Sequence, residues 1–298
     1  MYICKKRFMK LVAYLFIYPI IWFISILPFP LLYLLSDVIY FLVYRIIKYR
    51  KRVVRANIAL ALPHLTDSER KSIEKKFYSH MCDMFLEMAK TLSISRKEIE
   101  KRYVFTNMEV YHELEKKEKS IALLCAHYAS YEWAVSMNYH INYLGYGVYK
   151  QLANPYFDKL VRKIRSKFKS QLIDSKETIP TMASNFRSKT FSVYGLVSDQ
   201  SPKLSTTHHW QKFMGHEVPV HTGGEMLAKK YDMNVIFLKT KKVKRGYYEA
   251  SFEVLSDGNA KDIPNYEITD NFLKLVEQQI YDAPEFYLWT HKRWKHKR

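Results

Sequence analysis

Residues 120–133, SIALLCAHYASYEW, contain the stretch that decides the fold. Residues 120–126 (SIALLCA) form an uncharged, mainly apolar run, which is typical of a strand buried on both faces of a sheet. His127 follows this strand directly, and Glu132 comes five residues later. Because polar residues that follow buried strands gather at one edge of an α/β sheet, His127 is the first candidate for a functional site.

Strand-like and helical segments alternate in the rest of the chain. A capping-box pattern, Thr66-x-x-Glu69, begins an early helix. We expect further strands at residues 146–152, 191–197, 234–240 and 247–255, and helices from Asn154-Pro155 to about residue 168 and at residues 223–231 and 268–281. This alternation predicts an α/β layered sheet, with residues from about 60 to 298 in one domain.

The N-terminal part of the chain carries a long apolar stretch. Residues 11–36, LVAYLFIYPIIWFISILPFPLLYLLS, contain no charge, and basic residues precede and follow them. Pro28 and Pro30 divide the apolar sequence into residues 11–27 and 31–47. At about 17 residues, each helix would be about 26 Å long, which is marginal for a hydrocarbon core of about 30 Å.

We expect the apolar stretch to be retained as a membrane anchor, because the sequence around Pro28 and Pro30 is a poor signal-peptide cleavage site. Two topologies are open: a single short span made by the first segment, or a bent hairpin that dips into one leaflet. The alternative is a buried hairpin in a soluble protein, although a charge-free run of this length favours the membrane. We therefore expect residues 1–58 to form the anchor and a basic juxtamembrane segment, and residues 59–298 to form the catalytic domain.

Charge and composition narrow the possible partners. The 298 residues include 48 Lys and Arg against 29 Asp and Glu, a net charge of +19. This excess indicates an acidic partner: nucleic acid, an anionic membrane, an acidic protein or a phosphorylated substrate. Three widely spaced cysteines form no disulfide framework, which favours a reducing compartment. The histidines between residues 208 and 221 lack the helical zinc-binding spacing, so we expect no metal.

Two further groups join His127 as candidate site residues. Asp199 follows the third predicted strand. A basic cluster that includes Arg162 and Arg165 lies in the helix after the second predicted strand, where a guanidinium fork suits phosphate or carbonyl oxygen. If a helix begins after His127, Glu132 can pair with the imidazole. Such a pair suits a general base that acts on an alcohol.

Six segments of the chain, in the same order, resemble the bacterial lipid A biosynthesis acyltransferases of the lauroyl and myristoyl type, within the lysophospholipid acyltransferase superfamily. The first is His127-x-x-x-x-Glu132, since this superfamily carries a His followed five residues later by Asp or Glu. The others are YRKRVVRANIALALP (residues 49–63), VYKQLANPYFDKLVRKIRSKF (148–168), VSDQSP (197–202), KFMGHEVPVHTGGEMLA (212–228) and PEFYLWTHKRWK (284–295). With the apolar N-terminus, the resemblance spans nearly the whole chain.

This resemblance implies a fold with a mixed central sheet flanked by helices, as in glycerol-3-phosphate acyltransferase. It also implies transfer of a fatty acyl chain from an acyl-carrier protein thioester to a hydroxyl of a lipid A precursor or related glycolipid. The acceptor would be phosphorylated, and neither a metal nor an organic cofactor would be needed. The enzyme would sit at the bacterial inner membrane, with its catalytic domain on the cytoplasmic side.

The resemblance also implies roles for individual residues. His127 would be the general base that deprotonates the acceptor hydroxyl, and Glu132 would orient it. The substrate-binding residues would be Arg165, at the developing oxyanion or a phosphate, together with Arg162, Lys163, Lys150, Asp199 and Gln200. The chain departs from the family at Ser130-Tyr131, where the lipid A enzymes often have Asn-Trp, at Lys150, where Arg is common, and at Met214, which interrupts an aromatic pair.

Other functions fit parts of the same pattern. A related acyltransferase would keep the chemistry and use a lysophospholipid, an aminolipid or a polyene lipid as acceptor. A protein of another class, a membrane-tethered nucleic-acid-binding protein, would use the basic residues instead. The sequence favours the enzyme, because His127 and Asp199 follow strands. An acidic carrier protein, a phosphorylated glycolipid and an anionic membrane together account for the positive charge without nucleic acid.

Overall fold

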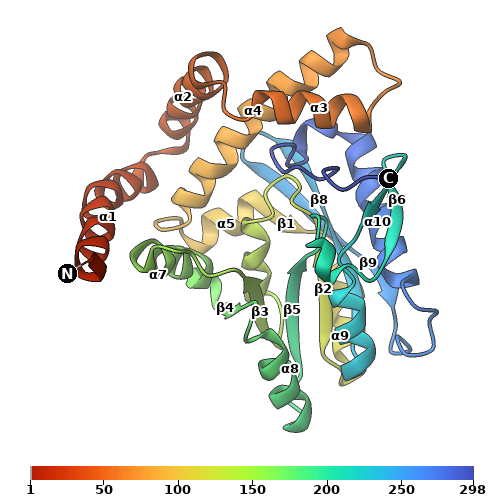
Figure 1. Cartoon of the computed structure of the whole chain (residues 1–298). Helices are drawn as coiled ribbons and strands as arrows, with labels where there is room; N and C mark the ends of the chain where they lie inside the picture. The colour runs from red at the N-terminus through yellow and green to blue at the C-terminus, as the bar shows by residue number, and fades with distance from the viewer. Residues whose placement is uncertain (1) are drawn as a thin grey trace.

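A seven-stranded sheet runs through the middle of the molecule, in the order β1-β9-β8-β2-β5-β3-β4 (Figure 1). The computed structural model describes the backbone of residues 2–298 and side chains from Phe8 onward, so the side chains of Cys4 and of the predicted basic flank at residues 5–7 lie outside the described residues. The strands are β1 (Tyr103–Phe105), β2 (Ile121–Cys125), β3 (Leu144–Tyr149), β4 (Gln171–Asp174), β5 (Ser192–Val197), β8 (Asn234–Lys244) and β9 (Tyr247–Ser256). A separate hairpin consists of β6 (Trp210–Phe213) and β7 (His216–Pro219).

The sheet is mixed, as the resemblance implied. β8 and β9 are antiparallel, whereas the other neighbours in the seven-stranded sheet are parallel. β2 lies at its centre and is buried at every position, which confirms the interpretation of its apolar sequence. The five predicted strands are all present, with ends shifted by up to a few residues. The short strands β1 and β4 and the β6–β7 hairpin are not among the predicted ones.

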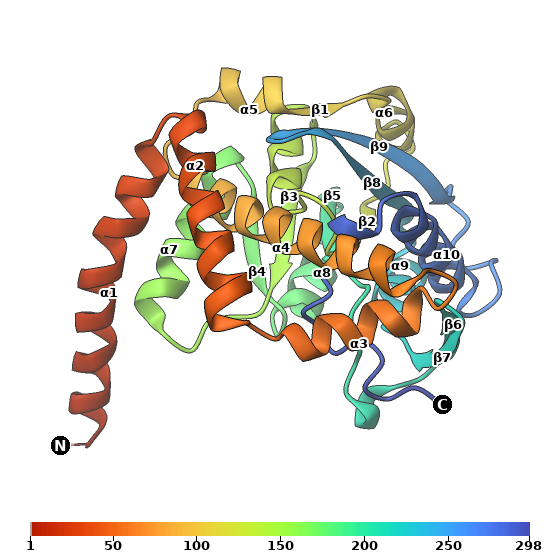
Figure 2. The ribbon, with the colours of Figure 1, turned by 90° about the horizontal axis from the view of Figure 1, so that it is seen from above.

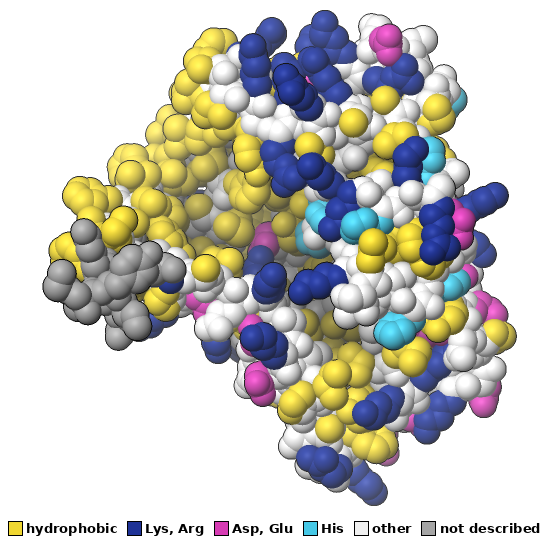
Figure 3. Space-filling model, in the orientation of Figure 1, with side chains coloured by type: hydrophobic (Ala, Val, Ile, Leu, Met, Phe, Trp, Pro, Cys, Tyr) yellow, Lys and Arg dark blue, Asp and Glu magenta, His cyan; other side chains and the backbone are white. Residues whose placement is uncertain are grey.

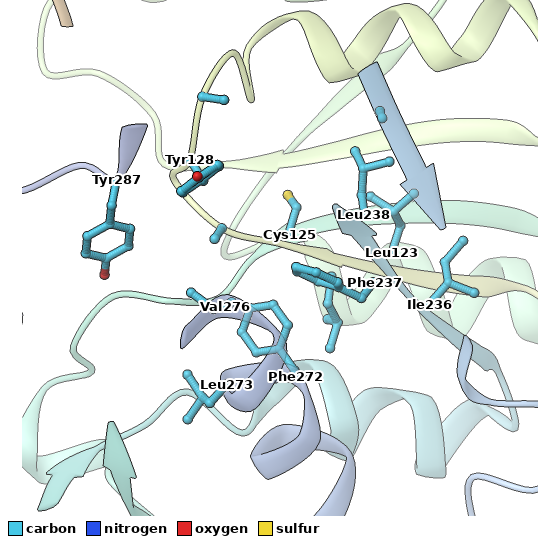
Figure 4. Close-up of a cluster of buried hydrophobic side chains, with 14 of the residues drawn as sticks. Leu123, Cys125, Tyr128, Ile236, Phe237, Leu238, Phe272, Leu273, Val276 and Tyr287 are labelled. Carbon is cyan, nitrogen blue, oxygen red and sulfur yellow. The ribbon is translucent and has the colours of Figure 1, made fainter. Parts of the chain in front are cut away.

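Helices cover both faces of the sheet. Leu238 of β8 pairs with Phe252 of β9, so these two side chains share a face, and Phe252 packs on Tyr111 of α6 (Met108–Glu115). Phe237, the next residue along β8, therefore points to the other face, where its ring meets Phe272 of α10 (Glu267–Asp282) at 5.7 Å. Figure 4 shows this second packing, with Phe237 between β2 and the α10 side chains.

The remaining helices pack around this core. They are α3 (Lys51–Ala61), α4 (Asp67–Lys90), α5 (Arg96–Arg102), α7 (Pro155–Arg165), α8 (Thr178–Arg187) and α9 (Gly223–Tyr231), with 3₁₀ turns η2 (Trp133–Tyr139), η3 (Ser166–Phe168), η4 (Leu204–Thr206) and η5 (Pro284–Phe286). The predicted capping box is confirmed at the start of α4: the backbone N–H of Glu69 donates to Thr66 Oγ1, and Glu69 accepts from the Thr66 backbone. Asn154 caps α7 in a similar way through its side-chain oxygen.

Two apolar helices precede the domain. α1 (Tyr2–Ile26) is followed by α2 (Phe29–Tyr40), which continues as a π-helix, η1 (Phe41–Ile47). The break falls at the predicted place, because Pro28 has an extended backbone and Pro30 lies in the first turn of α2. The stretches Phe8–Ile26 and Phe29–Ile47 are each long and apolar enough to cross a membrane. In Figure 2, α1 lies at the margin of the molecule and α2 lies between α1 and α4.

Candidate active site

The centre of the candidate site is a hydrogen-bonded pair, His127 and Asp199. β2 and β5 are parallel and pair Cys125 with Val197, so the residues two positions beyond each strand face one another. His127 Nδ1 lies 2.7 Å from Asp199 Oδ1, and the backbone N–H of His127 donates to the same oxygen at 3.0 Å. Asp199 is only 1% exposed. The strand register therefore fixes both ends of the pair.

We expected His127 to pair with Glu132, but the structure pairs His127 with Asp199 and Glu132 with Arg165. Glu132 forms a two-point ion pair with Arg165 at the end of α7, with Nε–Oε2 and Nη2–Oε1 distances of 2.8 and 2.5 Å. The prediction assumed that a helix follows His127 at once. Instead the chain turns through Ala129, whose φ of 48° is left-handed, and η2 begins only at Trp133. Without a helical turn between them, Glu132 does not return to the imidazole.

The C-terminal segment closes the loop that carries His127. The backbone N–H of Leu288 donates to the carbonyl of His127 at 3.1 Å, and the N–H of Ala129 donates to the carbonyl of Phe286 at 2.9 Å. Tyr128 and Tyr287 thereby form an isolated antiparallel bridge. Residues 284–295 were among the segments of the resemblance, and these bonds show that they brace the histidine loop.

The charges of the pair favour a basic imidazole. Burial alone would lower the pKa of His127, but the Asp199 carboxylate and its hydrogen bond raise that pKa above its ordinary value. Burial would raise the pKa of Asp199, but the charge of His127 and two hydrogen bonds from it lower that pKa. Asp199 is therefore the ionised partner of a histidine that accepts a proton readily.

The second imidazole nitrogen, Nε2, faces the side chain of Gln200, which can donate a hydrogen bond. With Nδ1–H donated to Asp199, Nε2 of a neutral His127 carries the lone pair. The amide nitrogen of Gln200 lies 3.3 Å from Nε2, so it can donate to that lone pair. The ring of Tyr131 packs edge-on against the imidazole at 5.0 Å. A substrate hydroxyl in the place of the Gln200 amide would give its proton to Nε2.

The other predicted cationic binding residues lie on α7 and in the segment that precedes it. Arg165 is half-buried. Burial would lower the pKa of its guanidinium, but the two hydrogen bonds that it donates to Glu132 and the charge of that carboxylate raise the pKa. Arg162 is exposed and donates from Nη1 to the Tyr149 hydroxyl at 3.3 Å. Lys163 and Lys150 are exposed. The structure thus brings Arg165 to Glu132 and leaves the other three cations exposed on the surface.

Sequence reasoning missed a group of hydrogen-bonded residues that joins the segment after Asp199 to the C-terminal segment. The backbone N–H of Ser201 donates to His291 Nε2 at 3.4 Å, and the Ser201 hydroxyl donates to the carbonyl of Arg293 at 2.5 Å. Burial, against the opposing charge of Asp199, lowers the pKa of His291 to about 4. Asn57 on α3 donates to the carbonyls of Trp289 and His291 at 2.8 and 2.6 Å. The sequence did offer one signal for this group, because these residues belong to the segments 49–63, 197–202 and 284–295 that carry the family resemblance.

An apolar hollow lies on the face that Figure 3 shows. Figure 3 shows it between the N-terminal helices and the body of the protein, with hydrophobic side chains along its walls and histidine side chains beside it. A base held by a buried carboxylate, at the carboxyl edge of a mixed sheet, has the arrangement of an enzyme that activates a hydroxyl.

Comparison with known sequences identifies the family of this chain. The chain matches the bacterial lipid A biosynthesis acyltransferases over residues 2–296 and belongs to that family. It is 23% identical to the lipid A biosynthesis lauroyltransferase of Escherichia coli (strain K12) over 278 residues, which cover 93% of this chain and 89% of that protein. It is 19% identical to lipid A biosynthesis acyltransferase 2 of Shigella flexneri over 248 residues, 83% and 78% of the two chains. The protein is therefore an acyltransferase, and the enzyme hypothesis is confirmed over the nucleic-acid-binding one.

Proposed function

We propose that this acyltransferase moves a fatty acyl chain from an acyl-carrier protein thioester to a hydroxyl of a lipid A precursor. His127 acts as the general base. The reaction takes place at the bacterial inner membrane, with residues 1–58 as the anchor and residues 59–298 as the catalytic domain on the cytoplasmic side. The observation that carries the proposal is the buried Asp199 carboxylate on His127 Nδ1, which leaves Nε2 as a proton acceptor.

The chemistry follows from that geometry. The acceptor hydroxyl takes the place of the Gln200 amide at His127 Nε2 and gives its proton to the ring as its oxygen attacks the thioester carbon. The imidazolium that forms is stabilised by Asp199. When the tetrahedral intermediate collapses, the carbon–sulfur bond breaks, and the imidazolium returns the proton to the leaving thiolate. The products are an ester and the free thiol of the carrier.

Arg165 binds substrate oxygen, and Glu132 positions it. Nε and Nη2 of the guanidinium donate to the two carboxylate oxygens of Glu132. Among the described residues no hydrogen bond occupies Nη1, so this end of the fork can donate to the thioester oxyanion or to an acceptor phosphate. Glu132 thus acts through Arg165 and does not orient the base directly.

The exposed face of α7 supplies the charge for the acidic partners. Lys159, Arg162 and Lys163 are exposed on this helix, whereas its one acidic residue, Asp158, is buried. Lys150 is exposed on the approach to the same helix. We assign this surface to the carrier protein and to the phosphate groups of the glycolipid, because both are anions that must come close to Arg165.

The proposal is tested by lipid mass spectrometry and by transfer with purified protein. Cells with and without the gene should differ in one acylated lipid A species, and the full-length protein should form that species from a carrier-protein thioester. A coenzyme A thioester should be a poorer donor, because it lacks an acidic protein surface to meet α7. If the enzyme acylates a lysophospholipid, an aminolipid or a polyene lipid in place of the glycolipid, the proposed acceptor is wrong. The proposed acyl-transfer chemistry would still hold.

A further inference from the structure

The second apolar helix is attached to the catalytic domain along its whole length. The Tyr33 hydroxyl donates to Glu87 at 2.9 Å, and the Ser36 hydroxyl donates to Asp83 at 2.8 Å. Further along, the ring of Tyr44 lies 5.1 Å from that of Tyr78. Residue numbers rise along α2–η1 as they fall along α4, so the two helices are antiparallel neighbours from end to end.

An ion network fixes the middle of this contact. Arg245, at the end of β8, lies 2.6 Å from Asp37 of α2 and 2.7 Å from Asp83 of α4. Lys242 completes the network, 3.5 Å from Asp83, which is buried. Asp37 stands next to the midpoint of the apolar stretch Phe29–Ile47. If this stretch crossed a bilayer, two carboxylates and two cations would lie near its centre, where charged groups are most costly.

α1 is also attached to the domain, at two separate points. Near the start of its apolar stretch Phe8–Ile26, Lys10 donates to the carbonyl of Ala153, and Tyr14 packs against the ring of Phe157 on α7 at 5.7 Å. Near its end, Lys90 of α4 donates to the carbonyl of Leu27 at 2.7 Å. These contacts are about 25 Å apart along the helix at 1.5 Å per residue. A domain that touches both ends of the apolar stretch of α1 cannot lie on one side of a membrane that this stretch crosses.

The outer surface of the two helices is apolar and ends in basic residues. Phe16 is 74% exposed, Leu34 61% and Ile47 66%. Arg45, Lys48 and Arg50 are exposed just beyond, and residues 38–66 contain no Asp or Glu. An apolar face with cations at its margin is complementary to the interface of an anionic phospholipid leaflet.

From these attachments we infer that neither apolar helix crosses the membrane. α1 and α2–η1 together form a monotopic surface whose outer face lies in the cytoplasmic leaflet of anionic phospholipid, with the domain on the same side. The inference rests on the proposed membrane location and decides between the two topologies that the sequence left open. The apolar hollow of Figure 3 lies beside the same helices, on the side that would face the leaflet.

Depth measurements on the full-length protein test the inference. Single cysteines at Phe16, Leu34, Val38 and Ile46, all exposed, are labelled with a fluorophore in a Cys4→Ser background, where Cys82 and Cys125 are buried. Quenching by phosphatidylglycerol-containing vesicles with nitroxides at known depths should place all four labels at one shallow level, about 5–10 Å into the leaflet. Two results would overturn the inference in favour of a span. One is a label at Val38 that lies deeper than the labels at Leu34 and Ile46, and the other is a label at Phe16 that lies at the bilayer centre.

Two charge variants give an independent measurement. Leu34→Lys should weaken vesicle binding about tenfold, whereas Met226→Lys, which adds the same charge at a 51% exposed position on α9, should leave it unchanged. Equal vesicle binding by Leu34→Lys and the unaltered protein would overturn the inference. In the depth measurement, labels that are reached only by a water-soluble quencher would overturn it as well. Acyl transfer to a detergent-dispersed acceptor is measured in parallel. Retained transfer with a spanning depth profile would refute the topology alone, whereas absent transfer would refute the proposed function.

Discussion

The two ion pairs of the site differ in what holds them in place. The backbone register of two neighbouring strands fixes His127 and Asp199, and the carboxylate is almost fully buried. Glu132 and Arg165 come from a turn and from the last residue of α7, and the Arg165 side chain is 26% exposed. The first pair suits proton transfer, which needs fixed geometry, and the second suits substrate binding, which benefits from access to solvent.

Loss of the base should have the largest effect. His127→Ala should lower the rate of acyl transfer by about 10³–10⁴-fold, because no other group takes the proton of the acceptor. His209→Ala is the matched control, since His209 also forms a histidine–aspartate pair, at 2.8 Å to Asp270, but is not joined to His127 in the described contacts. Circular dichroism and thermal unfolding check that both variants fold. Comparable losses in the two variants would show that removing any such pair damages the protein.

Removal of the Asp199 charge should change the pH dependence as well as the rate. Activity requires neutral His127 and therefore falls as the pH falls through its raised pKa. In Asp199→Asn, burial is no longer opposed, so the pKa of His127 drops and the acid limb of the kcat/KM profile moves to lower pH. The rate at the optimum should also fall, by about 10²–10⁴-fold, because the tautomer is no longer fixed. An unmoved acid limb would mean that Asp199 does not set the basicity of His127.

The Glu132–Arg165 pair should respond differently. Arg165→Lys loses the two-point fork and should lower kcat/KM about tenfold to a hundredfold, mainly through KM. Glu132→Gln should have a similar effect, and the double variant should be little worse than either, because the two residues act as one unit. The charges of Glu132 and Arg165 shift the pKa of His127 in opposite directions. Because Arg165→Lys keeps its positive charge, this variant should leave the acid limb in place, in contrast to Asp199→Asn.

The sequence predicts that His127 and Asp199 both follow buried strands, but it does not predict that they form a hydrogen-bonded pair or that Glu132 pairs with Arg165. An apolar run signals a buried strand, and equal spacing beyond two parallel strands brings His127 and Asp199 to one edge. The partner of Glu132 depends on the left-handed turn at Ala129, which no simple sequence rule favours at an alanine. The short strands β1 and β4 carry too few residues to show periodicity. The bond from Leu288 to His127 joins residues far apart in the chain and leaves no local signal.

The smallest effect is expected where the C-terminal segment is secured to α3. Asn57→Ala removes both donors to the carbonyls of Trp289 and His291 and leaves these acceptors without that partner. The free energy of unfolding should fall by about 2 kcal/mol, measured by denaturant titration. Asn265→Ala removes an exposed contact with Lys229 and should change stability by less than about 0.5 kcal/mol.

Because Asn57 forms no described contact with His127 or Asp199, acyl transfer by Asn57→Ala at low temperature should fall only a few-fold, and the acid limb of its pH profile should not move. A loss of transfer as large as that of His127→Ala, in a folded Asn57→Ala protein, would place the C-terminal segment in the chemistry and remove the distinction between the fixed pair and its support.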